Sequence, residues 1–231
     1  MKRSEINHII HDMETLIQKQ GYALPVWADW APEKWMTEEH TEEIVENKLG
    51  WDITDFGLKK YRECGFALFT LRNGNIAQKE KYPKPYAEKL LMMYEGQEMC
   101  MHYHWSKMED IINRGGNDLI IEVWNGTETG EKLDTPVIVS CDGIKREVPA
   151  GYEVRLHPGQ SITIQPYLYH LFRVPETGGS VLIGEVSTCN DDDNDNRFYE
   201  EVGRFPSIEE DEPPYHLLCT EYDSFQTGLS N

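Results

Sequence analysis

Between residues 66 and 187 the sequence is a succession of short β-type segments with no helical period between them. Alternating or continuous apolar residues mark about nine such segments: 66–71, 89–94, 98–105, 118–124, 137–141, 152–156, 161–165, 171–174 and 181–187. Glycine, proline, asparagine and aspartate separate them, as is usual between strands. Because the segments are closely spaced and no helix is predicted between them, the pattern predicts an antiparallel barrel or sandwich rather than a parallel sheet.

The regions before and after these segments have a different pattern. Apolar residues recur at helical spacing over 4–20, and an acidic stretch over 38–49 also predicts a short helix. We expect 1–231 to form one domain. Its β core would be flanked by an N-terminal helical arm (about 1–60) and wrapped by an acidic C-terminal segment (about 190–231).

The charge of the chain limits its partners. Lys and Arg number 22 and Asp and Glu number 41, so 22 − 41 gives a net charge of −19. Such a surface repels nucleic acids and anionic membranes, and neither is expected as a partner. A neutral small molecule meets no such barrier.

Cysteine usage and hydropathy indicate the compartment. The five cysteines are odd in number and lack metal-type spacing, so reduced thiols are expected. The first residues lead into an amphipathic segment rather than a signal-peptide core, and no run is long and apolar enough to span a membrane. We therefore expect a cytoplasmic protein.

The residues with the most specific chemistry lie near the middle of the chain. His102 and His104 are two apart in a predicted strand, so their side chains point to the same face. Glu109 follows five residues later, and His170 lies in a later strand. Three imidazoles and one carboxylate predict a metal centre; the alternative is a pair of surface histidines on an edge strand.

Such a ligand set leaves two positions open on an octahedral ion. Nitrogen and oxygen ligands without thiolate suit Mn²⁺, Fe²⁺, Co²⁺, Ni²⁺ or Zn²⁺. Cys100 has the same strand parity as the two neighbouring histidines. We interpret it as a core residue, because the ligand set is complete without it.

Two further ionisable residues are predicted inside the barrel. Lys107 shares parity with Glu109, and Glu185 lies within the apolar segment 181–187, where an unpaired carboxylate is costly to bury. Beside a metal they would form an acid–base pair. The alternatives are a lysine in water at a hairpin tip and a solvent-facing glutamate.

The central segment resembles the first cupin motif, because five residues occur at its fixed spacing: Gly96, His102, His104, Glu109 and Gly116. The second cupin motif is incomplete. Pro166 precedes His170, but the glycine expected between them is absent and the spacing is one residue short.

Over nearly its whole length the chain resembles the D-lyxose isomerase family of cupin sugar isomerases. The resemblance rests on residues 1–7, 102–113, 158–161, 170, 184–187 and 190–192. It implies a cupin-type antiparallel β-barrel (jelly roll) with a few flanking N-terminal helices. It also implies a homodimeric aldose–ketose isomerase, usually with Mn²⁺, that interconverts D-lyxose and D-xylulose, and D-mannose and D-fructose.

Carried over residue by residue, the resemblance puts His102, His104, Glu109 and His170 at the metal positions. Lys107 and an acidic residue would move the proton through a cis-enediolate. Strand parity favours Glu185 as that acid, with Glu201 second.

Three more residues are expected to bind the monosaccharide: Lys89, Asp195 and Arg204. The alternative for the acidic loop around Asp195 is simple solvation. Rival functions are a cupin dioxygenase, a cupin glucose-6-phosphate isomerase, which the charge of −19 disfavours, and a non-catalytic sugar-binding cupin.

Overall fold

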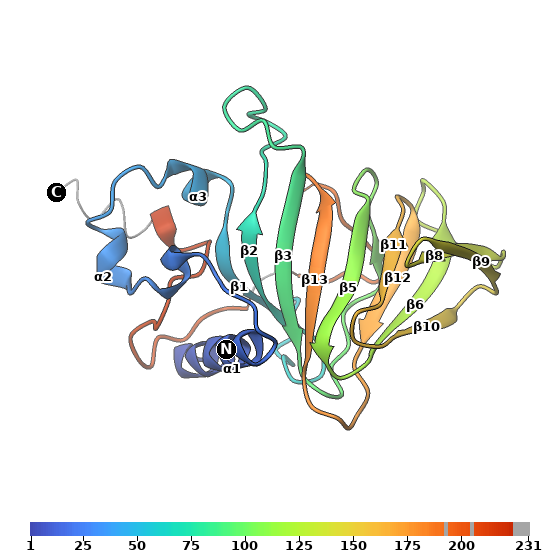
Figure 1. Ribbon diagram of the computed structural model, residues 1–231, viewed down its shortest axis with the longest axis horizontal. Helices are drawn as coiled ribbons and strands as arrows, with labels where there is room; N and C mark the ends of the chain where they lie inside the picture. The colour runs from blue at the N-terminus through green and yellow to red at the C-terminus, as the bar shows by residue number, and fades with distance from the viewer. Residues whose placement is uncertain (192–193, 204–205, 224–231) are drawn as a thin grey trace.

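A computed structural model describes residues 1–191, 194–203 and 206–223 of the chain (Figure 1). Four helices lie in the N-terminal part: α1 (Arg3–Lys19), the 3₁₀ helix η1 (Val26–Asp29), α2 (Pro32–Trp35) and α3 (Glu42–Glu46). The strands are β1 (Gly50–Thr54), β2 (Phe66–Arg72), β3 (Tyr86–Met93), β4 (His102–Tyr103), β5 (Glu109–Gly116), β6 (Leu119–Gly126), β7 (Lys132–Leu133), β8 (Val137–Cys141), β9 (Ile144–Val148), β10 (Tyr152–Leu156), β11 (Ser161–Ile164), β12 (Leu168–Arg173), β13 (Val181–Thr188) and β14 (Arg197–Phe198).

The strands form two antiparallel sheets. The larger sheet has the order β1-β2-β3-β13-β5-β11-β8-β9, and the smaller has β10-β6-β12-β4-β14 with β7 paired to β6. The middle of the larger sheet faces the viewer in Figure 1, and the smaller sheet lies behind its far end. Neighbours such as β13 and β5 are far apart in sequence, so the barrel closes through long-range pairing.

The core lies between the two sheets. Along β5, buried and more exposed residues alternate, so that Ile111 faces inward and Asp110 faces out. Apolar residues from both sheets meet there in one cluster, including Leu91, Ile121 and Phe172. This arrangement confirms the predicted cupin-like antiparallel barrel with flanking N-terminal helices.

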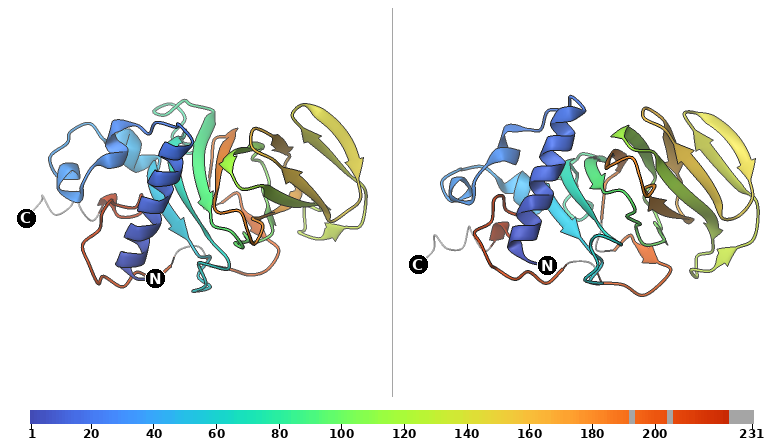
Figure 2. Two further views of the ribbon diagram at one scale, coloured as in Figure 1. Left: turned by 60° about the horizontal axis from the view of Figure 1, so that its bottom comes forward. Right: turned by 90° about the horizontal axis from the view of Figure 1, so that it is seen from below.

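A second apolar cluster attaches α1 to the outer face of the larger sheet. Ile6, Ile10, Met13 and Ile17 lie on one side of α1 and are buried, and they pack with residues of β1, β2, β3 and β13. The views in Figure 2 show α1 crossing this end of the sheet. No helix in the described part of the chain is long and apolar enough to cross a membrane.

The C-terminal segment lies against the start of α1. Lys2 forms an isolated bridge with Glu209, and the Arg3 guanidinium is bonded to the carboxylates of Glu210 and Glu221. Arg3 is only 1% exposed. Ion pairs of the buried Arg3 side chain therefore join the start of α1 to the C-terminal segment.

Several local predictions were wrong. The N-terminal arm is not purely helical, because 50–54 forms β1, the edge strand of the larger sheet. The stretch 144–148, expected as a connection, forms the edge strand β9. Of the strand predicted over 98–105, only β4 is regular, and the helix predicted over 38–49 is limited to α3.

Asn73-Gly74 looks like a hairpin signal in sequence but begins a long loop between β2 and β3. The Asn73 side chain forms two hydrogen bonds with the Asn190 backbone. Its Nδ2 donates to the Asn190 carbonyl at 3.1 Å, and its Oδ1 accepts from the Asn190 N–H at 3.0 Å. A Cβ on Gly74 would lie 1.8 Å from the Lys84 carbonyl oxygen. The two residues therefore permit a close crossing of loops rather than a tight turn.

Candidate active site

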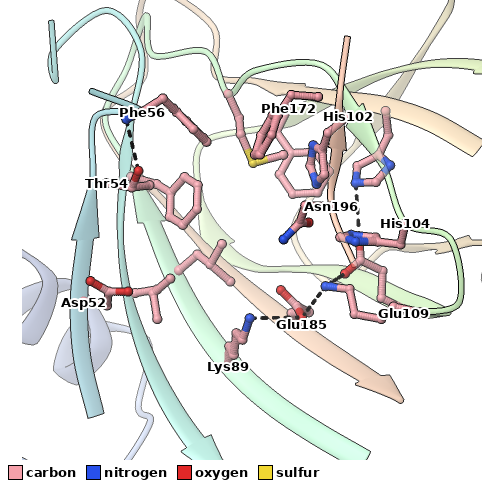
Figure 3. Close-up of a pocket in the computed structure, with 17 residues that line it drawn as sticks. Asp52, Thr54, Phe56, Lys89, His102, His104, Glu109, Phe172, Glu185 and Asn196 are labelled. Atoms are coloured by element: carbon pink, nitrogen blue, oxygen red, sulfur yellow. Dashed lines mark hydrogen bonds and ion pairs between the residues drawn. The ribbon is translucent and has the colours of Figure 1, made fainter. Parts of the chain in front are cut away.

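A cavity of about 100 Å³ opens between the sheets, and Figure 3 shows it in close-up. Its walls are partly apolar and partly charged. The polar side chains that line it are Asp52, Thr54, Lys89, His102, His104, Lys107, Glu109, His170, Glu185 and Asn196. Strands β1, β3, β4, β5, β12 and β13 and the loops beside them contribute these residues, so the site depends on the closed barrel.

The three histidines predicted as ligands converge on one side of this cavity. His102 lies opposite His170 across the β4–β12 pair, and the two ring centroids are 4.2 Å apart. His104 lies just after β4. The donor nitrogens of the three rings all fall within 4.8 Å of one another, which is a geometry able to hold a metal ion.

Backbone carbonyls fix the tautomer of each ring. The Nδ1 atoms of His102, His104 and His170 lie 3.0, 2.8 and 3.0 Å from the carbonyl oxygens of Cys100, Asp195 and Leu168. A carbonyl only accepts, so each Nδ1 carries a proton and each neutral ring keeps its lone pair on Nε2. Metal-binding histidines typically have this backbone support.

The Nε2 atoms fit a bound cation. Within the described ranges, the Nε2 atoms of His104 and His170 are buried and make no hydrogen bond. They lie 3.5 and 3.3 Å from Oε1 of Glu109, so lone pairs face a carboxylate oxygen. A cation between them would satisfy all three atoms, since two ligands of one ion lie about 3 Å apart.

The electrostatics of the cluster favour the metal-binding protonation states. Burial lowers the pKa of His102 well below its usual range, helped by the two neighbouring imidazoles. Burial and the Lys107 ammonium lower the pKa of His104. Burial alone would raise the pKa of Glu109, but Lys107 and the histidines hold it well below its usual range. Neutral imidazoles and an ionised carboxylate therefore coexist.

Two lysines and two glutamates adjoin the histidines. Lys107 Nζ lies 2.6 Å from Glu109 Oε2 and 3.0 Å from Glu185 Oε1, and Lys89 Nζ lies 3.7 Å from the same Glu185 oxygen. All four are at least nine-tenths buried. The sequence predicted that Lys107 and Glu185 face the interior, and both line the cavity; Figure 3 labels Glu185 beside Lys89.

Asp195 occupies a different position from the one predicted. Its carboxylate accepts from the backbone N–H and hydroxyl of Ser106 at 2.9 and 3.0 Å and from the Lys107 N–H at 2.8 Å. It is 8% exposed and is turned away from the cavity, because these three donors occupy it. Asp195 supports the turn between the ligands, and its neighbour Asn196 lines the cavity instead.

One other predicted residue lies away from the cavity, and one cannot be placed. Glu201 is exposed and lies outside the cavity lining. Arg204 falls outside the described residues. Sequence reasoning missed the wall formed by Asp52 and Thr54, because it assigned β1 to an irregular arm; a short β-type run around Trp51 and Ile53 was the available signal.

The incomplete second cupin motif keeps the expected backbone shape. Tyr167, three residues before His170, has a φ of 61°, a conformation that glycine adopts most readily. Its N–H donates to the His104 carbonyl at 2.9 Å, and its carbonyl accepts from Gly126 at 2.8 Å. These bonds hold a strained residue in the turn that leads to the third histidine.

Two curled antiparallel sheets around a buried cluster of three histidines define a cupin-like protein. The profile of the D-lyxose isomerase family matches residues 1–222. The chain belongs to this family.

Relatives and solved structures agree with this assignment. The D-lyxose/D-mannose isomerase of Escherichia coli O157:H7 is 43% identical over 228 residues, covering 98% of this chain and 100% of that protein. The enzyme of the same name from Serratia proteamaculans is 45% identical over 227 residues, 97% and 99% of the two chains. The ligand-free L-ribose isomerase of Cellulomonas parahominis has a TM-score of 0.60 at 17% identity, with 90% and 98% coverage, and shows the fold alone. The chain is thus an enzyme of the aldose–ketose isomerase class.

Proposed function

We propose that the protein interconverts D-lyxose and D-xylulose, and also D-mannose and D-fructose. The observation that carries this proposal is the contact of Lys107 with both Glu109 and Glu185 beside the three histidines, within one buried cavity. A lysine between two carboxylates is suited to moving a proton, and the curated relatives are named for these aldoses.

The proposed metal ligands are His102, His104, His170 and Glu109, and the proposed ion is Mn²⁺, with Co²⁺, Fe²⁺, Ni²⁺ or Zn²⁺ as substitutes. The orphaned Nε2 atoms and the ionised Glu109 support this set. When bound, such an ion supplies Lewis-acid polarisation of the sugar carbonyl.

The remaining chemistry belongs to the side chains. Glu185 removes the proton from C2 of the open-chain aldose, the released electron pair forms the C1–C2 double bond of a cis-enediolate, and the carbonyl pair moves onto O1. The O2 proton then passes to O1, Glu185 returns its proton to C1, and the double bond between C2 and O2 forms, which gives the ketose. Lys107 donates a hydrogen bond to the oxygen on which negative charge develops, and its contact with Glu185 at 3.0 Å keeps it beside the reacting carbons.

Lys89 is proposed as a substrate-binding residue. It is 4% exposed, lines the cavity and lies next to Glu185, so its ammonium can donate to a sugar hydroxyl while it holds the carboxylate in place. Asp52 and Thr54 lie on the opposite side of the cavity from the histidines (Figure 3), where the far end of an extended sugar would reach.

We further propose that the protein works as a homodimer in the cytoplasm. All five cysteines are free thiols, which fits a reducing compartment. Light scattering would test the assembly: a chain of 26.8 kDa predicts 2 × 26.8 = 53.6 kDa for the dimer.

One assay tests the function. The metal is stripped, each divalent ion is restored in turn, and a panel of free aldoses and ketoses is screened for interconversion. We expect D-lyxose and D-mannose to be converted, with no oxygen consumed. Oxygen uptake would indicate a dioxygenase, and sugar binding without product would indicate a binding protein.

The route is tested in heavy water. Proton transfer through the enediolate predicts deuterium in the product at the carbon that receives the proton. A hydride shift between C2 and C1 would give product with no deuterium at all.

A further inference from the structure

Two cysteines from different parts of the chain meet beside the metal cluster. The Sγ atoms of Cys64 and Cys100 are 3.2 Å apart, although 36 positions separate the residues in sequence. Both side chains are partly buried and pack against the edge of the barrel core. Neither residue has a role in the proposed isomerisation.

The backbone holds these two segments side by side. Cys64 forms an isolated bridge with Glu98, the Glu98 N–H donates to the Glu63 carbonyl at 2.9 Å, and the Gly65 N–H donates to the Glu98 carbonyl at 3.3 Å. The Met99 N–H is anchored to Phe172 of β12 at 2.8 Å. The main chain therefore keeps the two cysteines next to each other.

We propose that Cys64 and Cys100 form a reversible disulfide, and that its formation weakens metal binding in the adjacent cluster. An S–S bond of about 2.05 Å requires the two sulfur atoms to approach by only about 1 Å, so Cys100 can move toward Cys64 while the backbone bonds of Glu98 and Met99 stay in place. The site is within reach of a small oxidant, because neither thiol is fully buried.

Hydrogen peroxide is a sufficient oxidant. Two S–H bonds and the O–O bond break, one S–S bond and two O–H bonds form, and two water molecules leave. The sulfur atoms lose two electrons in total and the peroxide gains them. A dithiol reductant reverses the change by exchange.

The link to the metal runs through the Cys100 carbonyl. This oxygen holds Nδ1 of His102 at 3.0 Å and so sets the orientation of one proposed ligand. Drawing Cys100 toward Cys64 shifts that carbonyl. Loss of a supporting bond of this kind typically lowers metal affinity about 10- to 100-fold.

The first test follows the thiols and needs no turnover, so failure of the isomerase assay would leave it intact. The metal-loaded protein is exposed to equimolar hydrogen peroxide, and its thiols are then counted after denaturation. Five thiols should fall to 5 − 2 = 3, with a peptide linking positions 64 and 100 that dithiothreitol separates. Sulfinic acid, a different pairing or five unreacted thiols would overturn the proposal.

Two variants sharpen this result. Cys141→Ser, on β8, removes a thiol away from the pair and should still form the 64–100 link. Cys64→Ser should form no disulfide. A link in the second variant, or none in the first, would contradict the assignment.

The second test measures Mn²⁺ affinity before and after oxidation. Oxidised wild-type protein should bind Mn²⁺ about 10-fold more weakly, and reduction should restore the affinity. Cys64→Ser given the same peroxide should be unchanged. Equal affinity of the oxidised and reduced wild-type protein would remove the link to the metal cluster.

Discussion

At the scale of single residues, hydrogen bonds outside the cavity decide what the side chains inside it can do. Each imidazole donates a hydrogen bond from its Nδ1–H to a main-chain carbonyl, so its Nε2 can act only as an acceptor or a metal ligand. Lys107 is shared by two carboxylates, so its charge is balanced without solvent. The cavity can therefore hold two positive and two negative side chains at low exposure.

The choice of Glu185 as the base predicts a specific loss. Glu185→Gln keeps the shape of the side chain but cannot accept a proton, so kcat should fall about 10²- to 10⁴-fold with metal content unchanged. Glu201→Gln is the comparison, since Glu201 is exposed outside the cavity. Steady-state kinetics with D-lyxose measures both variants. A loss of kcat in Glu201→Gln and not in Glu185→Gln would show that Glu185 is not the base.

Two of the buried histidines, His102 and His104, also predict how stability depends on pH. Their lowered pKa means that the folded metal-free protein binds fewer protons than the unfolded chain below about pH 6.5, so the free energy of unfolding should fall as pH falls. The slope is on the order of 1.4 kcal/mol per pH unit for each imidazole until its folded pKa is reached. Urea unfolding at pH 5 to 8 measures it. The same slope in His102→Asn/His104→Asn would contradict this explanation.

The residue types of the site could be predicted where sequence neighbours share a face. His102 and His104 share one parity, and Lys107 and Glu109 share the other, so alternation predicts which face each pair shares. The turn that brings both pairs into one cavity could not be predicted from alternation. Asp195 was misjudged because its function depends on a turn almost 90 positions away, which no local pattern reveals.

At the scale of elements, the turn between β4 and β5 is the critical connection. It carries His104 at its start and Lys107 near its end, and Asp195 fixes it through three hydrogen bonds. A short strand such as β4 could not hold these positions alone. The loop before β14 therefore acts as a support for a ligand and for the proposed acid–base residue.

A substitution that changes one atom of Asp195 tests this support. Asp195→Asn replaces an accepting oxygen with an amide that faces N–H or O–H donors, so it should destabilise the protein by about 1–3 kcal/mol and weaken Mn²⁺ binding about 10-fold. Asp142→Asn is the matched control, because Asp142 also binds a serine N–H and hydroxyl, at Ser161, but is exposed. Equal effects of the two variants on Mn²⁺ affinity would refute the role.

Elements rich in apolar residues were predicted well, and those with few apolar residues were not. The segment 152–156 forms β10 with the expected limits. β1, β5 and β9 were missed because each contains only two apolar residues, too few to mark a strand in the sequence. The 98–105 run forms bonds to several segments in place of one ladder, which depends on the tertiary structure.

At the scale of the whole molecule, the helical arm and the C-terminal segment close the outside of the barrel together. Arg3 joins α1 to Glu210 and Glu221, while α1 is also fastened to the sheet by its apolar face. We propose that these parts form one cooperative unit with the barrel, as the sequence predicted for a single domain.

Replacing Arg3 tests whether these parts unfold together with the barrel. Arg3→Leu should lower the free energy of unfolding by about 1–3 kcal/mol, because the partly buried Glu221 loses its charged hydrogen-bond partner while Glu210 is solvated, and should leave a single transition. Arg155→Leu breaks a half-exposed pair with Asp118 and should cost less than about 1 kcal/mol. Calorimetry that resolves a separate early transition for the arm would contradict the single unit.

The account as a whole requires one ion held by three imidazoles and a carboxylate. Anomalous diffraction from a crystal grown with Mn²⁺ measures this directly. We predict a single strong peak inside the barrel, about 2.1 Å from Nε2 of His102, His104 and His170 and from a carboxylate oxygen of Glu109. A cavity without a peak, or a peak bound elsewhere while these four side chains contact only one another, would contradict the account.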